Sequence, residues 1–142
     1  MALRIIDHGT SEYHQMVTLR NDILRKPIGI NLLSNELEKE KDNLMIGAFE
    51  DEQILGCCML VQENYDTVRL RQMAVLNTLQ GKGIGRALMQ FAENLARDHG
   101  YKKISMHARK NAVGFYEKMG YCKSGNEFIE ITIPHFIMGK KL

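Results

Sequence analysis

The 142-residue sequence lacks several features that would indicate particular classes of protein. Its longest apolar runs, such as residues 54–61, are far too short to span a bilayer. Its formal net charge is only +2, so it lacks the strong basic excess of a general nucleic-acid-binding protein. We therefore expect neither a membrane nor a nucleic acid as partner.

Cysteine is scarce, and its spacing suits neither a disulfide framework nor a zinc site. Cys57, Cys58 and Cys122 form no CxxC pair and leave one thiol over. This pattern is typical of a reducing compartment, where thiols are small buried side chains. The N-terminal stretch reaches Asp7 before any long apolar region, unlike a signal peptide. The sequence therefore predicts a cytoplasmic protein with no metal.

No repeat, low-complexity stretch or linker divides the chain, so residues 1–142 are expected to form one domain. Hydrophobic periodicity predicts a mixture of strands and helices. The expected strands cover residues 3–6, 44–50, 53–62, 67–75 and 103–108, with two further short strands between residues 121 and 138. Four helices are expected. The first begins at Thr10 or Ser11 and stops at residues 25–29. The others cover residues 34–41, the segment from the glycine run to Gly100, and residues 111–119.

This order of elements predicts an α+β fold. Residues 44–75 supply three strands in series, which favours an antiparallel meander. The strand, helix and strand across residues 67–108 fit a crossover between parallel neighbours. We expect a mixed, mostly antiparallel sheet of six to seven strands with helices on both faces. Pro134 is disfavoured inside a central ladder because it lacks an N–H donor.

The most informative segment is the run Gln80-Gly81-Lys82-Gly83-Ile84-Gly85-Arg86. Its three glycines permit a sharp turn and place no Cβ in the way of an incoming group. The helix that follows begins with free amides at its positive dipole end, which is a site for anions. Lys82 and Arg86 add full positive charges. The run therefore predicts a pyrophosphate cradle, the alternative being a plain turn before a helix.

Two familiar phosphate-loop patterns fit this run poorly. A Walker A loop needs Ser or Thr after its lysine, whereas Gly83 follows Lys82. A dinucleotide fingerprint needs a third glycine for close helix–sheet packing, and Arg86 occupies that position. The pattern that remains is Q-x-x-G-x-G after a strand that ends at Val75.

That pattern resembles the cofactor signature of the GNAT superfamily, the acetyl-CoA-dependent N-acyltransferases. Gln80, Gly83 and Gly85 occupy its defining positions. A second segment, in which Asn111 precedes the run Phe115-Tyr116-Glu117-Lys118-Met119-Gly120-Tyr121, is similar to the family's N-x-x-x-x-F-Y-x-x-x-G-[F/Y] motif. The tail from Glu130 through Pro134 and His135 resembles the ElaA-like bacterial branch. The order of elements agrees along about the full length.

The resemblance implies that acetyl-CoA is the donor substrate. Its pyrophosphate would lie on the amides of residues 81–86. Its pantetheine arm would pair with the strand that ends at Val75, where a splayed parallel strand pair holds it. The implied cofactor-binding residues are Met73, Ala74, Val75, Gln80, Gly81, Lys82, Gly83, Ile84, Gly85, Arg86, Asn111, Phe115 and Tyr116.

The reaction implied is direct attack of a primary amine, from a small molecule or a peptide, through a tetrahedral intermediate. The Val75 amide would bind the oxyanion, and Tyr116 is similar to the family's general acid. Many relatives place a basic carboxylate on the strand before the loop, but residues 68–73 contain none. His107, His135 and Glu130 are the candidate bases, and imidazole has the intrinsic pKa for this role.

Each of these residues also has a structural interpretation. Tyr116 could be a core tyrosine, Asn111 a helix cap, Glu130 a solvated charge, and each histidine a structural residue. The alternative function is a non-catalytic acyl-CoA-binding or sensing module, and a weaker one is another kind of nucleotide-binding protein. Many relatives pair through their C-terminal strands, so the resemblance also suggests a homodimer.

Overall fold

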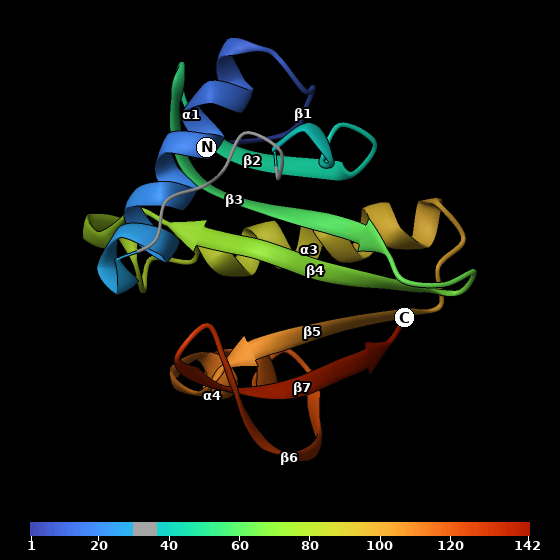
Figure 1. The fold of residues 1–142 in the computed structure, drawn as a ribbon. Helices are drawn as coiled ribbons and strands as arrows, with labels where there is room; N and C mark the ends of the chain where they lie inside the picture. Colours follow the sequence, from blue (N-terminus) through green and yellow to red (C-terminus); the bar gives the residue numbers. More distant parts are fainter. Residues whose placement is uncertain (30–36) are drawn as a thin grey trace. The chain divides into compact units, whose positions relative to one another are not determined.

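The computed structural model describes residues 1–29 and 37–142, and within these ranges seven strands form one mixed sheet (Figure 1). The hydrogen-bonded strand order is β1-β2-β3-β4-β5-β7-β6. The strands are β1 (Ala2–Ile6), β2 (Leu44–Glu50), β3 (Gln53–Gln62), β4 (Thr67–Val75), β5 (Lys103–Arg109), β6 (Cys122–Glu130) and β7 (Ile133–Lys141). The α-helices are α1 (Ser11–Arg20), α3 (Ile84–Asp98) and α4 (Val113–Glu117).

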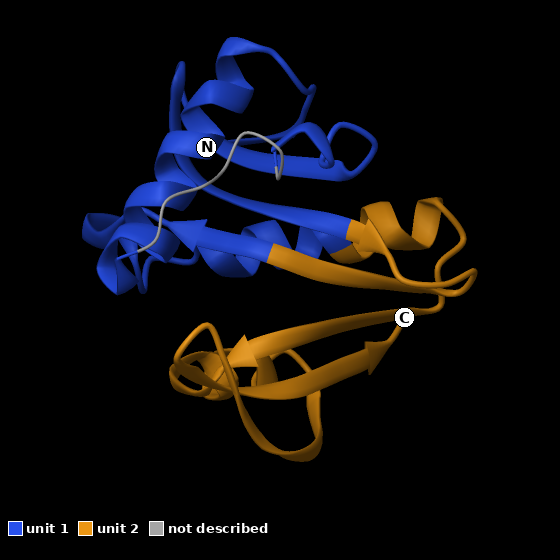
Figure 2. Cartoon of the chain, in the orientation of Figure 1, with its two compact units in different colours: residues 1–60, 72–92 blue, residues 61–71, 93–142 orange. Residues whose placement is uncertain are grey.

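The chain separates into two compact units, which Figure 2 colours blue and orange. Unit 1 comprises residues 1–60 and 72–92, and unit 2 comprises residues 61–71 and 93–142. Strands β3 and β4 and helix α3 each contribute residues to both units. The expectation of one domain stays a prediction. No helix in residues 1–29 and 37–142 is long and apolar enough to cross a membrane.

In unit 1, helices cover both faces of β3. A Cβ added to Gly56 would lie 3.1 Å from Ile84 and from Leu88, so α3 packs closely on this face. The next residue, Cys57, points to the opposite face because strand side chains alternate. Burial raises the pKa of Cys57 to about 12, and the neighbouring Arg20 guanidinium of α1 opposes part of that rise. The predicted helices on both faces are therefore confirmed for this unit.

Helix α1 begins as predicted but ends earlier. The Thr10 hydroxyl accepts a hydrogen bond from the Tyr13 amide at 3.2 Å, which satisfies a donor that the first turn leaves free. The helix ends at Arg20 and continues as a π-helix over Asn21–Arg25, then as a 3₁₀ turn over Lys26–Ile28. The predicted breaker at residues 25–29 is therefore present, with a change of helix type before it.

A buried ion pair fixes the end of α1 to the chain beyond residue 36. The Arg20 guanidinium, fully buried, donates to both oxygens of Glu40 at 2.7 and 2.6 Å. The Tyr13 hydroxyl donates to the same carboxylate at 3.0 Å. Burial and the Glu40 charge raise the pKa of Tyr13 to about 12, so its hydroxyl remains a donor at neutral pH. Residues 34–36 of the predicted helix 34–41 lie outside the described residues; residues 37–38 are helical, and a turn follows.

In unit 2, the first residues of β4 pair in parallel with β5. The pairs run from Thr67 with Lys103 to Leu70 with Met106, which confirms the predicted parallel neighbours. Strand β5 then pairs antiparallel with β7, and β7 with β6. The last two strands were predicted to be short, but each spans nine residues.

Pro134 is the second residue of β7, and its position agrees with the expectation that proline is disfavoured inside a central ladder. It pairs with Ile129 of β6, whereas the β5 pairs begin one residue later, at His135. The missing N–H therefore falls where the ladder has a neighbour on one side, which proline tolerates. A correction concerns the thiols: Cys57 and Cys58 are buried as expected, but Cys122 is exposed.

Glu40→Gln should destabilise the protein strongly, because it leaves the buried Arg20 charge uncompensated. Breaking one partner of a buried pair costs about 3–5 kcal/mol. Urea denaturation measures this loss directly. The matched control is Glu38→Gln on the exposed side of the same segment, which should change the unfolding free energy by less than about 0.5 kcal/mol. Equal losses in the two variants would contradict a structural role for the pair.

Candidate active site

The predicted phosphate cradle lies between β4 and α3 in unit 1. Gly81 and Gly83 have φ values of +81° and +87°, a region that other residues enter only at a cost. A Cβ at either position would meet no atom within 4 Å. These glycines are therefore required by the backbone conformation, and the space in front of them is open.

Helix α3 presents free donors and no acid at this end. Its first hydrogen bond runs from the Ala87 amide to the Gly83 carbonyl at 3.0 Å, so the amides of residues 84–86 have no intrahelical acceptor. The first turn contains no acidic residue, and Lys82 and Arg86 are exposed beside it. Free amides, the positive end of the helix dipole and two cations together favour a bound anion.

Gln80 holds this loop to the end of β4. Its side-chain amide donates to the Val75 carbonyl at 3.1 Å and to Asn77 Oδ1 at 3.2 Å. The Leu76 amide donates to the Leu55 carbonyl of β3 at 3.0 Å, which fixes the same corner. Gln80 was predicted to bind the cofactor, and its contacts here give it the further role of positioning the loop.

The predicted pantetheine strand follows a local distortion of β4. Gln72 has φ +58°, unusual for a residue other than glycine, and its carbonyl accepts from the Cys57 thiol at 3.5 Å. The described parallel pairs with β5 end two residues earlier, at Leu70. Ala74 is buried, whereas Met73 and Val75 are half-buried. The splaying of the pair, and the binding of pantetheine by these residues, stay predictions.

In unit 2, the predicted acid Tyr116 lies on α4 and is 6% exposed. Its ring makes edge contacts with Phe115, at 5.0 Å between centroids, and with Tyr121, at 5.9 Å. Its carbonyl accepts from the Met119 and Tyr121 amides, so the turn after α4 closes on it. Phe115 is 38% exposed. The cap of α4 is Ala112, without a side-chain bond, so the structure does not support the alternative that Asn111 is merely the cap.

A buried carboxylate supports this turn, and the sequence analysis did not identify it. Glu93 of α3 accepts from the Tyr121 hydroxyl at 3.0 Å and from Lys140 Nζ at 3.0 and 3.2 Å. Lys140 also donates to the Met119 carbonyl at 2.9 Å. The one sequence signal is the position of Glu93, four residues after the buried Met89, on the apolar face of α3.

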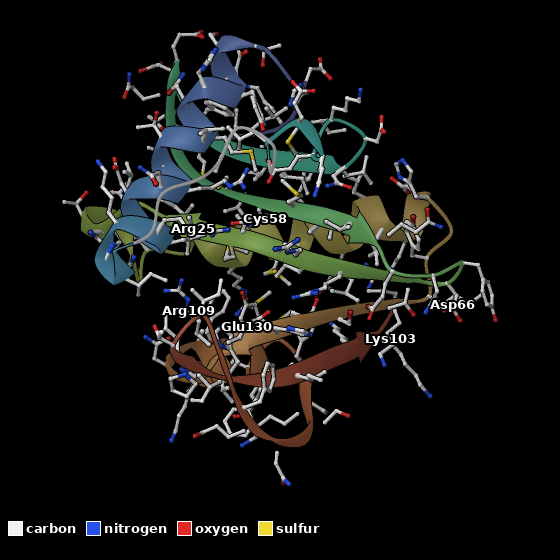
Figure 3. The ribbon with its side chains drawn as sticks, in the orientation of Figure 1. Arg25, Cys58, Asp66, Lys103, Arg109 and Glu130 are labelled. Atoms are coloured by element: carbon white, nitrogen blue, oxygen red, sulfur yellow. The ribbon has the colours of Figure 1, made fainter. Side chains whose placement is uncertain are left out.

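The candidate bases meet in one group, the Glu130 cluster, made of Arg69, His107, Glu130 and His135. The members come from β4, β5, β6 and β7 of unit 2, and Glu130 is labelled in Figure 3. Glu130 Oε2 lies 3.1 Å from His107 Nδ1 and 4.0 Å from His135 Nε2. Arg69 Nη2 lies 2.9 Å from His107 Nδ1 and 3.9 Å from Glu130 Oε1. Glu130 is therefore not simply a solvated charge.

The cluster forms because the strand register brings these residues together. Arg69 pairs with Ser105, and His107 follows Ser105 by two residues, so Arg69 and His107 share a face of the sheet. His135 pairs with Arg109, two residues further along β5. Ile131 and Thr132 both have positive φ, forming the tight turn that returns the chain from Glu130 into β7.

Comparison with known proteins identifies the family of this chain. A family model described as the acetyltransferase (GNAT) domain matches residues 13–142. The chain belongs to the GNAT acetyltransferase family. The N-acetyltransferase YjcF of Bacillus subtilis is 31% identical over 108 residues, which cover 75% of this chain and 74% of that protein. YyaT of the same organism is 32% identical over 76 residues, or 54% of this chain. The aligned part spans about half the length of YyaT.

Solved structures of the family share the fold. An aminoglycoside 6'-N-acetyltransferase complexed with coenzyme A has a TM-score of 0.84 at 17% identity, covering 99% of this chain and 97% of that one. ElaA of Escherichia coli has a TM-score of 0.82 at 17% identity, covering 98% of each chain. These identities show the fold alone, so membership of the ElaA-like branch stays a prediction.

The glycine loop of this GNAT protein fits the diphosphate of coenzyme A. The loop offers open space, free first-turn amides and two exposed cations, and no carboxylate of the first turn opposes an anion. The expectation that no metal is needed stays a prediction. Within residues 1–29 and 37–142 we find no group of three His, Cys, Asp or Glu side chains that could hold a metal ion.

Gly83→Asp should weaken coenzyme A binding by about tenfold or more relative to Gly83→Asn, as measured by calorimetry. Both side chains have the same shape and both tolerate positive φ better than most residues, so the comparison isolates the negative charge. Equal affinities of the two variants would show that the diphosphate does not lie at Gly83.

Proposed function

We propose that this protein is an acetyl-CoA-dependent N-acetyltransferase that acetylates the primary amine of a small molecule or a peptide. The observation that carries the proposal is the open glycine cradle at the start of α3, in a chain that belongs to the GNAT family. Bound acetyl-CoA would supply the acetyl group as an activated thioester. The cytoplasmic location and a homodimer remain predictions alongside this function.

The donor site proposed here consists of main-chain groups more than side chains. The amides of residues 81–86 would bind the diphosphate, with Lys82 and Arg86 adding attraction from the solvent side. Backbone groups of Met73–Val75 would pair with the peptide-like pantetheine arm. Asn111 and Phe115, both exposed on the α4 side, would contact the same cofactor.

Tyr116 is the general acid of this proposal. A phenol is protonated at neutral pH and can donate its proton to a leaving thiolate. The ring is held by Phe115 and Tyr121, so it would deliver the proton from a fixed position. The Val75 amide would donate a hydrogen bond to the oxygen that becomes negatively charged. A histidine of the Glu130 cluster would deprotonate the amine, which is charged in water.

One observation favours the alternative, a module that binds acyl-CoA without catalysis. Strand β4 carries no carboxylate over residues 67–75, where many relatives have their base. In that case coenzyme A would stabilise the protein while no amine was acetylated. The two functions therefore differ in turnover and share the binding reaction.

A thermal-shift comparison of coenzyme A, ATP and NAD tests the donor site. At one hundred times its dissociation constant, a ligand raises the unfolding free energy by about 2.7 kcal/mol. We expect such stabilisation from coenzyme A and little from ATP or NAD. Preferential stabilisation by NAD or ATP would contradict the site and support another nucleotide-binding class.

Tyr116→Phe should lower kcat by about a hundredfold near pH 7, because it removes the proposed proton donor and keeps the ring. The assay is release of free coenzyme A with a panel of primary amines, polyamines, amino acids and short peptides. Tyr65→Phe is the control, since Tyr65 is 88% exposed in the loop between β3 and β4, and it should leave kcat unchanged. Unchanged kcat in Tyr116→Phe would remove the acid role, and no turnover with any amine would favour the binding module.

A further inference from the structure

The two histidines of the Glu130 cluster differ in what their ring nitrogens can do. His135 Nδ1 lies 2.8 Å from the Ile133 carbonyl, which can only accept, so this nitrogen carries the hydrogen. Its Nε2 faces Glu130, its ring stacks on Phe128, and its side chain is only 9% exposed. His107 is 30% exposed, and the contacts that Arg69 and Glu130 make with its ring both use Nδ1.

Nδ1 of His107 cannot satisfy both of these neighbours at once. Arg69 can only donate, so a hydrogen bond from Nη2 at 2.9 Å requires a bare Nδ1. An ionised Glu130 can only accept, so a hydrogen bond at 3.1 Å requires a hydrogen on Nδ1. The neutral ring therefore has two states. With Glu130 as partner, Nε2 is bare and can accept a proton; with Arg69 as partner, Nε2 already carries one.

We propose that His107 is the catalytic base, that Glu130 is the positioning residue that keeps the hydrogen on Nδ1, and that Arg69 opposes protonation of the ring. This inference rests on the proposed function and deepens it, because it chooses between the two candidate histidines and assigns Glu130 and Arg69. The orienting carboxylate, the histidine and the bare outer nitrogen form the same relation that prepares bases in other acyl-transfer enzymes.

The protons balance in this scheme. The substrate ammonium gives one proton to His107 Nε2, and the resulting imidazolium donates to Glu130 from Nδ1. As the new carbon–nitrogen bond forms and the carbon–sulfur bond breaks, the leaving sulfur takes the Tyr116 proton. The second proton of the amine nitrogen returns to the Tyr116 oxygen through water, which restores the phenol. The imidazolium then releases its proton to solvent, so the net products are the amide, the free thiol and one proton.

The charged and titratable groups around the ring come from four strands. Arg69 faces it from β4, Glu130 from β6 and His135 from β7. On β5 itself, Arg109 lies two residues after His107, and Ser105 lies two residues before it. The Ser105 hydroxyl donates a hydrogen bond to Glu63. Phe128 contacts the ring edge-on at 5.3 Å. Glu130 thus places a negative charge, and Arg69 a positive charge, against the same ring nitrogen.

Removing Glu130 and removing Arg69 should move the acidic limb of the kcat/KM profile in opposite directions. Glu130→Gln removes the charge that stabilises the imidazolium, so the limb should move about 0.5–1 pH unit lower. Arg69→Met removes the opposing charge, so the limb should move about as far upward. Glu127→Gln, an exposed carboxylate of the same strand that pairs with Lys110, is the matched control and should leave the limb in place.

The same substitution at both histidines separates their roles. Asparagine can replace the Nδ1 donor of histidine and has no group equivalent to Nε2. His107→Asn should therefore lose the acidic limb and about a hundredfold in kcat, whereas His135→Asn should retain the limb. Loss of the limb in His135→Asn and its retention in His107→Asn would overturn the assignment in favour of His135.

A readout without substrate tests the ring itself. Nitrogen-15 NMR of the free protein distinguishes the two neutral tautomers, and His107→Asn identifies the signal. We expect the neutral ring to carry its hydrogen on Nδ1 in the wild type and on Nε2 in Glu130→Met, which removes the acceptor that glutamine would keep, while the signal of the exposed His14 stays unchanged. A wild-type ring protonated on Nε2 would overturn the proposal whatever the activity. If the enzyme turns over but the acidic limb of the kcat/KM profile stays in place in both Glu130→Gln and Arg69→Met, the assignment of His107 as base is overturned and the proposed function is not. If no amine is acetylated, the proposed function is overturned, and the catalytic role of His107 with it.

Discussion

The chain leaves β4 through two glycines at positive φ and enters α3 with its first amides free, and this constraint organises the rest of unit 1. A side chain with a Cβ would strain the turn at Gly81 or Gly83, and an acid in the first turn would oppose an anion. Gln80 fastens the turn to the end of β4, and the lack of a side chain at Gly56 lets α3 approach β3 closely. The proposed anion site would therefore follow from backbone geometry, with Lys82 and Arg86 as exposed additions.

Features that depend on neighbouring residues in the sequence were predictable. The strands at residues 44–50, 53–62 and 67–75 have the predicted bounds, because apolar runs between turn residues specify them locally. Thr10 caps α1 as expected, and the glycine run starts α3. The end of α1 was less predictable. Its change to a π-helix over Asn21–Arg25 accompanies the burial of Arg20 against Glu40, a contact between residues twenty positions apart.

The site residues that the sequence analysis missed are those whose partners lie far along the chain. Glu93 and Lys140 are ordinary surface residues by composition, and only the folded chain brings them together beneath Tyr121. Lys140, which pairs with this buried carboxylate and with the Met119 carbonyl, also restrains the C-terminal strand, and no local sequence pattern predicts that contact. Arg69 is a similar case, since its meeting with His107 depends on the register of two strands joined through α3.

The carboxylate of the Glu130 cluster comes from the end of β6. Strand β4 carries no carboxylate over residues 67–75, and Arg69 of that strand reaches the His107 ring instead. An arginine alone would suppress protonation of a neighbouring imidazole. Glu130 reaches the same ring from the end of β6, through a tight turn at Ile131 and Thr132 that continues into β7. Glu130 and Arg69 meet at a single nitrogen of the His107 ring. In the proposed role of His107 as the base, the balance between these two contacts would set whether the outer nitrogen is bare or carries a hydrogen, and replacing either residue should shift that balance.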